Sequence, residues 1–156
     1  MARIGHDTKQ ELQTVAQQTG QKLGDLVDES GWRKQGTESV GVSRQYLGSL
    51  GKVDNGQVAV FGSLVWGPER SLINTRLFLP EGWTDDAVRC DKAGIPQEAR
   101  QFKTKPMLAL EMVREDRQRR RHPIRIKLSS SLRSSGVIEP GVSTPEGSAP
   151  FPHPAP

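Results

Sequence analysis

The apolar residues of this 156-residue chain follow helix or strand spacing only as far as Val113. Beyond that point Arg114 to Arg121 is almost wholly charged, and from Ser129 onward the chain is rich in Ser, Gly and Pro. Six of the eleven prolines lie between Pro140 and Pro156. Such a composition buries too little apolar surface to offset the entropy lost on ordering. The pattern predicts one folded region before Val113 and a disordered tail over residues 114–156.

The excess positive charge is confined to one short stretch. Residues 1–113 contain fourteen basic and fourteen acidic side chains, whereas residues 114–127 contain seven basic and two acidic ones. The net charge of +4 therefore says little about the folded region. The basic stretch could bind nucleic acid electrostatically, although it lacks the interleaved aromatic residues that stack on bases. The alternative interpretation is an out-of-frame extension.

Several classes of protein are excluded by what the sequence lacks. Cys90 is the only cysteine, which excludes a disulfide framework and a multi-cysteine zinc site. No apolar run approaches the roughly 18 residues of a membrane span, and the N-terminus has no apolar stretch that could act as a signal peptide. The default expectation is a cytoplasmic protein that does not associate with a membrane.

The expected elements are a helix, several strands and then further helices. Helical spacing and a capping pattern predict an N-terminal helical segment, residues 1–23, that is separate from the main fold. Turn-forming residues at 51–56 predict a hairpin between the strands on either side. The expected ranges are helix 7–19, strands 23–28, 39–46, 57–66 and 72–79, a short helix from 84 to 94, a longer helix from 104 to 113, and an isolated strand at 124–128.

Asp28 is the candidate for metal chemistry. It ends a short apolar run, and a Gly-rich basic turn follows it directly. A carboxylate held at the end of a strand beside a phosphate-bearing groove can ligate Mg²⁺. Taken alone, Asp28 also fits an Asx-turn with Gly31. Glu29 should point to the opposite face of the strand. Three basic residues could contact phosphates or be ordinary solvated charges, namely Lys34, Arg44 and Lys52.

A series of short motifs follows in a fixed order along residues 24–113. These are Val27-Asp28-Glu29-Ser30-Gly31, Lys34-Gln35-Gly36, Ser39 to Tyr46, Gly51 to Val60, Leu77-Phe78-Leu79-Pro80, Trp83 and Lys103-Thr104-Lys105-Pro106. In this order the chain resembles bacterial insertion-sequence transposases, in the DDE superfamily of endonucleases. The resemblance implies an α/β fold, a partial RNase H-like mixed sheet with flanking helices, over residues 24–113.

The resemblance also implies a chemistry. Asp28 matches the first metal-binding Asp of the DDE triad, Mg²⁺ is the implied cofactor, and DNA at the transposon ends is the implied partner. In this family the second Asp ends the strand after the helix that matches residues 105–113, and the Glu lies further on. The acids that remain here, Glu115, Asp116, Glu139 and Glu146, do not end an apolar strand.

The triad is therefore predicted to be incomplete, in a truncated or frameshifted member of the family that is inactive alone. The alternative is a small non-enzymatic nucleic-acid-binding protein that acts through the basic stretch, residues 114–127. The sequence does not indicate the oligomeric state.

Overall fold

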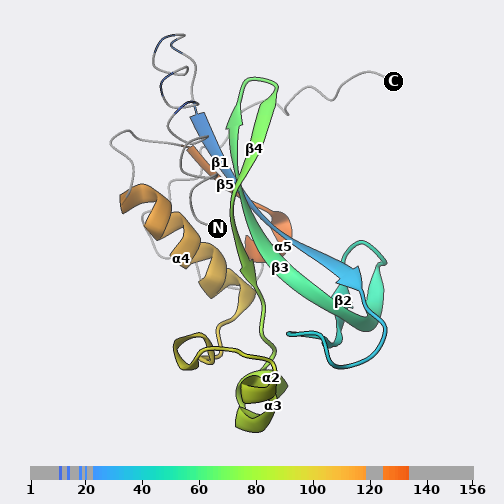
Figure 1. The fold of residues 1–156 in the computed structure, drawn as a ribbon. Helices are drawn as coiled ribbons and strands as arrows, with labels where there is room; N and C mark the ends of the chain where they lie inside the picture. The colour runs from blue at the N-terminus through green and yellow to red at the C-terminus, as the bar shows by residue number, and fades with distance from the viewer. Residues whose placement is uncertain are drawn as a thin grey trace.

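The computed structural model describes Glu11, Thr14, Gln18, Gly20 and residues 23–118 and 125–133. Most of the predicted N-terminal helix lies outside the described residues, although Glu11, Thr14 and Gln18 are helical. The elements, drawn in Figure 1, are β1 (Leu23–Arg33), β2 (Ser43–Leu47), β3 (Lys52–Trp66), β4 (Glu69–Leu77), α2 (Glu81–Thr84), α3 (Ala87–Lys92), η1 (Gln97–Ala99), α4 (Lys105–Gln118), β5 (Arg125–Leu128) and α5 (Ser130–Arg133).

The long strand β3 lies at the centre of a five-stranded mixed sheet. β1 pairs antiparallel with one edge of β3, from Leu23 opposite Trp66 to Arg33 opposite Gly56. The other edge of β3 is shared by β2 and β4, which are both antiparallel to it. β5 adds to the outer edge of β1 in the parallel direction. This arrangement confirms the predicted α/β class, and it is consistent with a partial RNase H-like fold.

The main core lies between the sheet and α4, which runs alongside the strands in Figure 1. Buried and less buried residues alternate at the start of β1, so that Val27 faces the helix. α4 approaches closely above Gly62, where an added Cβ would lie 3.2 Å from the Met112 Cε atom. The buried members of this core are Val27, Val60, Leu108, Ala109, Met112, Val113 and Leu132.

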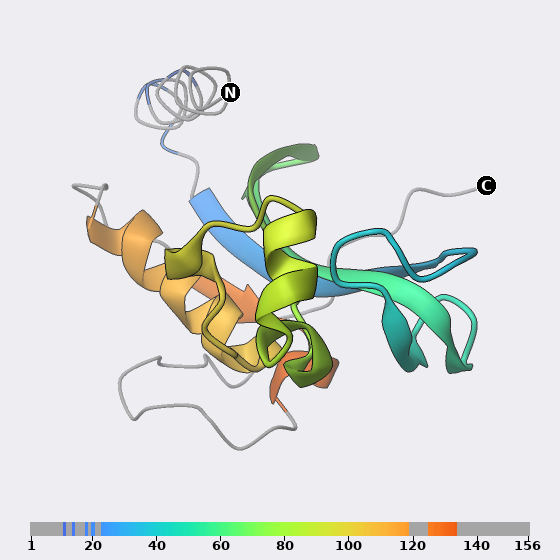
Figure 2. The ribbon, with the colours of Figure 1, turned by 60° about the horizontal axis from the view of Figure 1, so that its bottom comes forward.

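The chain between β1 and β2 crosses β3. The side-chain amide of Asn55 donates to the carbonyls of Lys34 and Gly36, and that of Gln57 donates to the carbonyl of Val40. These bonds hold residues 34–42 against the strand. Figure 2 shows this segment as the cyan trace that leaves β1 and returns to β2. β2 can then pair with the far edge of β3.

The predicted hairpin between β2 and β3 is confirmed, but its boundaries differ from the prediction. The strand predicted from residue 39 begins at Ser43, because residues 39–41 form a turn in which Gly41 has a φ of 76°. The tight turn lies at residues 48–51, with the Gly51 N–H bonded to the Leu47 carbonyl. The predicted turn at 51–56 is wrong because Lys52 already pairs with Leu47 at the start of β3.

Residues 125–133 correct the prediction for the tail. The strand predicted at 124–128 is confirmed as β5, but it is not isolated as predicted, because it pairs with β1, and Ile126 and Leu128 pack against the main core. α5 follows at once and contributes the buried Leu132. α4 also continues past the expected boundary at Val113 to Gln118. The sequence predicted this short strand, but its pairing with β1, far away in the sequence, was not predicted.

Candidate active site

Asp28 lies in the middle of β1, five residues before the strand ends at Arg33. The prediction that it ends a strand is therefore wrong. Its side chain is exposed, and its Oδ1 atom accepts a hydrogen bond of 2.8 Å from the Glu29 backbone N–H. The strand continues because Ser30 and Gly31 pair with Ala59 and Val58 of β3. The Gly-rich residues after Asp28 are thus strand residues.

Asp28 and its neighbours point to opposite sides of the sheet. The core residue Val27 and the next odd residue, Glu29, face α4, where the Glu29 carboxylate lies 3.2 Å from the Lys105 ammonium. This ion pair confirms the prediction that Glu29 points to the side opposite Asp28. Alternation along the strand places Asp28, Ser30 and Trp32 on the side away from α4, and all three are exposed. We call this second side the open side.

The strand next to Asp28 is β5. Val27 is the register partner of Leu128, and the Ser129 N–H donates to the Val27 carbonyl at 3.0 Å. If the register is continued by one residue past the end of β5, Ser129 becomes the neighbour of Asp28. This position follows the strand after α4, where the resemblance implies the second Asp. Sequence reasoning missed Ser129 because it did not foresee the pairing of β5 with β1.

The residues around Asp28 do not fit a two-metal site. Two divalent ions need several carboxylates that converge. The side chain next to Asp28 beyond the end of β5 is instead the neutral hydroxyl of Ser129. Within the part of the chain that the structure describes, no group of three or more His, Cys, Asp or Glu residues could hold a metal ion. The Mg²⁺ that the resemblance implies thus has one evident carboxylate ligand here.

The three predicted phosphate contacts are divided between the two sides of the sheet. Arg44 pairs with Asn55 of β3, and the Lys34 N–H donates to the Asn55 carbonyl. Arg44 and Lys34 therefore flank Asn55 on the open side. Lys52 lies on the other side, with its ammonium 3.3 Å from the Asp54 carboxylate. The structure brings two of the three residues together, and their contact with phosphate stays a prediction.

Asp54 is the centre of a small charged group on the α4 side of the sheet. Its Oδ1 atom accepts a hydrogen bond from the Asn55 N–H, and its Oδ2 atom lies 3.6 Å from the Arg33 guanidinium. The Asn55 N–H and the nearby ammonium of Lys52 hold the pKa of Asp54 below its ordinary value. Lys52 is therefore neutralised locally, which makes it a poorer candidate than Arg44 for binding phosphate.

A compact block formed by α2 and α3 holds the segment that contains Lys34. Trp83 is buried, and its indole N–H donates to the Val42 carbonyl at 2.8 Å. The Arg89 guanidinium lies 3.6 Å from the Trp83 ring centroid and donates to the Thr37 carbonyl at 2.6 Å. Both contacts fix the backbone between β1 and β2. The block thus positions a segment of the open side.

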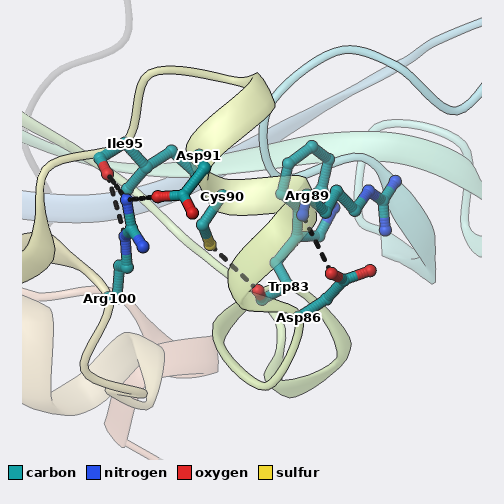
Figure 3. Close-up of polar contacts among 7 residues, drawn as sticks. All are labelled: Trp83, Asp86, Arg89, Cys90, Asp91, Ile95 and Arg100. Atoms are coloured by element: carbon teal, nitrogen blue, oxygen red, sulfur yellow. Dashed lines mark hydrogen bonds and ion pairs between the residues drawn. The ribbon is translucent and has the colours of Figure 1, made fainter.

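Figure 3 shows how the block is held together. The Asp86 carboxylate accepts a hydrogen bond from the Arg89 N–H and caps α3. Cys90 is a buried free thiol that donates to the Trp83 carbonyl. Arg100 bonds the Ile95 carbonyl and the Asp91 carboxylate and so closes the block. These contacts explain the acidic residues without a metal.

Comparisons with known proteins agree with the resemblance. A family model described as DDE superfamily endonuclease matches residues 8–127, more than half of the chain. A probable transposase for insertion sequence element IS701 from Microchaete diplosiphon is 54% identical over 35 residues, which are 22% of this chain and 9% of that relative. No solved structure matches the chain significantly.

The family match extends the resemblance beyond residues 24–113 in both directions. It includes the basic stretch 114–127 and so argues against an out-of-frame origin for that stretch. Among the described residues, no helix is both long and apolar enough to cross a membrane. Because the family match covers more than half of the chain, the chain belongs to the DDE superfamily endonucleases, and it is similar to an insertion-sequence transposase.

Proposed function

We propose that this chain is a DNA-binding member of the DDE transposase family that does not cleave DNA alone. The observation that carries the proposal is that the residue directly after β5, which follows the register partner of Val27, is Ser129 and not a carboxylate. Metal-assisted attack on a phosphodiester requires divalent ions that bridge the attacking and leaving oxygens. A single carboxylate ligand supplies too little charge and too few oxygens to hold two such ions.

DNA is the proposed partner, and a cytoplasmic location fits such a partner. The proposal that DNA is the partner is supported by the basic residues on the open side. Lys34 and Arg44 lie there, as do Arg70 opposite Val65 and Lys127 opposite Leu26. Asp28 is the one acidic residue that strand alternation places among them in the described sheet. Basic residues that gather on one surface are typical of proteins that bind the phosphate backbone.

The first test is a plasmid-nicking assay with the purified chain in Mg²⁺ or Mn²⁺. We expect no nicking above background, together with DNA binding that weakens as salt increases. Metal-dependent nicking that Asp28→Asn abolishes would contradict the proposal, because another acid must then complete the site. Nicking that survives Asp28→Asn would show that the site lies elsewhere.

A second test rebuilds the missing ligand. Ser129→Asp places a second carboxylate beside Asp28, about 5 Å away at the spacing of neighbouring strands. We expect this variant to bind Mn²⁺ measurably more tightly than the natural chain in calorimetry. Ser129→Asn is the matched control, because it has the same size without the charge. Equal Mn²⁺ binding by the two variants would show that Ser129 and Asp28 do not share a site.

A further inference from the structure

We infer that the open side of the sheet binds single-stranded DNA and that Trp32 stacks on an unpaired base. The inference rests on the proposed function and deepens it by naming the form of the DNA. Trp32 is 39% exposed on the same side of β1 as Asp28. Sequence reasoning passed over it because Trp32 falls in the segment interpreted as a turn.

The Trp32 ring is held in place although it is exposed. Its indole N–H donates to the Gln57 side-chain oxygen at 3.2 Å, and Gln57 is itself bonded to the Val40 carbonyl. The ring also packs against Phe61, with 6.5 Å between the centroids and 50° between the planes. An aromatic surface that is already ordered loses little conformational entropy when a base stacks on it.

The position of Trp32 relates it to Asp28. Trp32 lies four positions after Asp28 along the strand, which corresponds to about 13 Å. That distance is on the order of four nucleotides at the stacked spacing of about 3.4 Å. Lys34 lies one further alternate position along, about 20 Å from Asp28. A single DNA strand laid along β1 would thus pass the Asp28 carboxylate, the Trp32 ring and the Lys34 ammonium in turn.

Charge complementarity favours a nucleic acid over an apolar partner. In the described sheet, strand alternation places one acid, Asp28, on the open side, where Arg44, Arg70 and Lys127 also lie. On the α4 side, acids and bases form ion pairs, as in Glu29 with Lys105 and Asp54 with Lys52. The open side also exposes Leu72, which is 57% accessible and would suit a protein partner. An apolar helix bound to the open side would nevertheless offer no negative charge to Arg70 and Arg44.

The exposed Trp32 ring favours single-stranded DNA over duplex DNA as the ligand of the open side. An aromatic side chain on a sheet can stack only on a base whose face is exposed, and a duplex covers those faces with neighbouring bases. Basic residues with an interleaved aromatic ring are the combination that binds single strands without strong sequence preference. Trp32 supplies the aromatic ring that the basic stretch 114–127 lacks.

The test compares a fluorescent 20-nucleotide single strand with a duplex of the same sequence, by anisotropy on the full chain. We expect tighter binding of the single strand. Trp32→Ala should weaken it about five- to hundredfold, and Trp32→Phe should recover most of the loss. Phe102→Ala is the matched control, because Phe102 is 38% exposed and packs against Phe78 on the α4 side. It should change the affinity less than twofold.

A charge comparison sharpens the same test. Arg44→Gln should reduce the slope of log K against log salt by about 0.7 for single-stranded DNA. Lys52→Gln, on the other side of the sheet, should leave the slope unchanged. The pair separates contact on the open side from a general effect of net charge, since each variant removes one positive charge.

The outcomes distinguish the inference from the proposed function. Duplex binding that equals or exceeds single-strand binding, with no effect of Trp32→Ala or Trp32→Phe, would overturn the inference and leave DNA binding intact. Failure to bind either DNA would overturn both. If Trp32→Ala lowers self-association in sedimentation and leaves DNA binding unchanged, the open side docks protein and the inference is wrong. Thermal melts of each variant show whether it is folded.

Discussion

The two sides of the sheet share their strands but have different surroundings. On the α4 side, Val27 and Val60 are buried against Met112, and the charged residues there form ion pairs such as Glu29 with Lys105. On the open side, alternate residues of the same strands include exposed Trp32 and exposed Leu72. The α4 side therefore holds the main core. On the open side, residues 34–42 cover β3 at Gln57, but side chains along β1, Asp28 among them, stay exposed.

The first test of this difference shortens one apolar side chain on the α4 side of the sheet and one on the open side. Met112→Ala should lower the free energy of unfolding by about 2–5 kcal/mol, because it leaves a cavity above Gly62. Leu72→Ala should change it by less than about 0.5 kcal/mol, since the side chain is 57% exposed. Urea denaturation of both variants measures the two values. Equal losses would show that Leu72 is covered in solution.

A second test addresses the strand pair that both sides share. At Gly56 an added Cβ would lie 2.5 Å from the Trp32 carbonyl oxygen and 2.7 Å from the Leu47 Cδ1 atom. Gly56→Ala must therefore separate β1 from β3 or displace Leu47, at an expected cost of about 1–3 kcal/mol. The measurement is again the urea midpoint.

Gly82→Ala is the control for that test. Gly82 lies in α2, and an added Cβ would meet nothing within 4 Å. This variant should be neutral, or stabilising by up to about 1 kcal/mol, because alanine favours a helix. A Gly56→Ala protein as stable as the Gly82→Ala protein would show that β1 and β3 yield easily at this point.

The fold could be predicted where local signals and long-range pairing agree. Turn residues predicted that β2 and β3 form a hairpin, although they placed its turn too late, and apolar spacing predicted α4. The second half of β1 could not be predicted, because Ser30 and Gly31 read as a turn when taken alone. In the fold, Gly31 serves packing, since an added Cβ would lie 2.9 Å from the Leu47 Cδ2 atom. That requirement comes from a residue sixteen positions away in the sequence.

The candidate site was predictable in one strand only. Asp28 and the opposite orientation of Glu29 followed from the motif and from strand alternation. Ser129 could not be placed, because its position depends on parallel pairing of β5 with a strand about a hundred residues earlier. The division of Lys34 and Arg44 from Lys52 likewise depends on register, because one residue of shift exchanges the two faces.

The smallest expected effect concerns the charged group on the α4 side. The pKa of Asp54 is lower in the fold than its ordinary value of about 3.8. The ionised carboxylate therefore stabilises the fold above that pH, and its contribution is lost as the pH falls through the folded pKa. Asp54→Asn removes the interaction with Lys52 and Arg33, and Asn can still accept the hydrogen bond from the Asn55 N–H.

We thus expect Asp54→Asn to lower the melting temperature slightly at about pH 7, and the difference from the natural chain to shrink towards about pH 3. Added salt should also reduce the difference, because these charges are near solvent. Asp85→Asn is the control, since the described structure shows no ion pair at this exposed carboxylate, and its effect should be independent of salt. A difference at Asp54 that grows on acidification would mean that the carboxylate destabilises the fold.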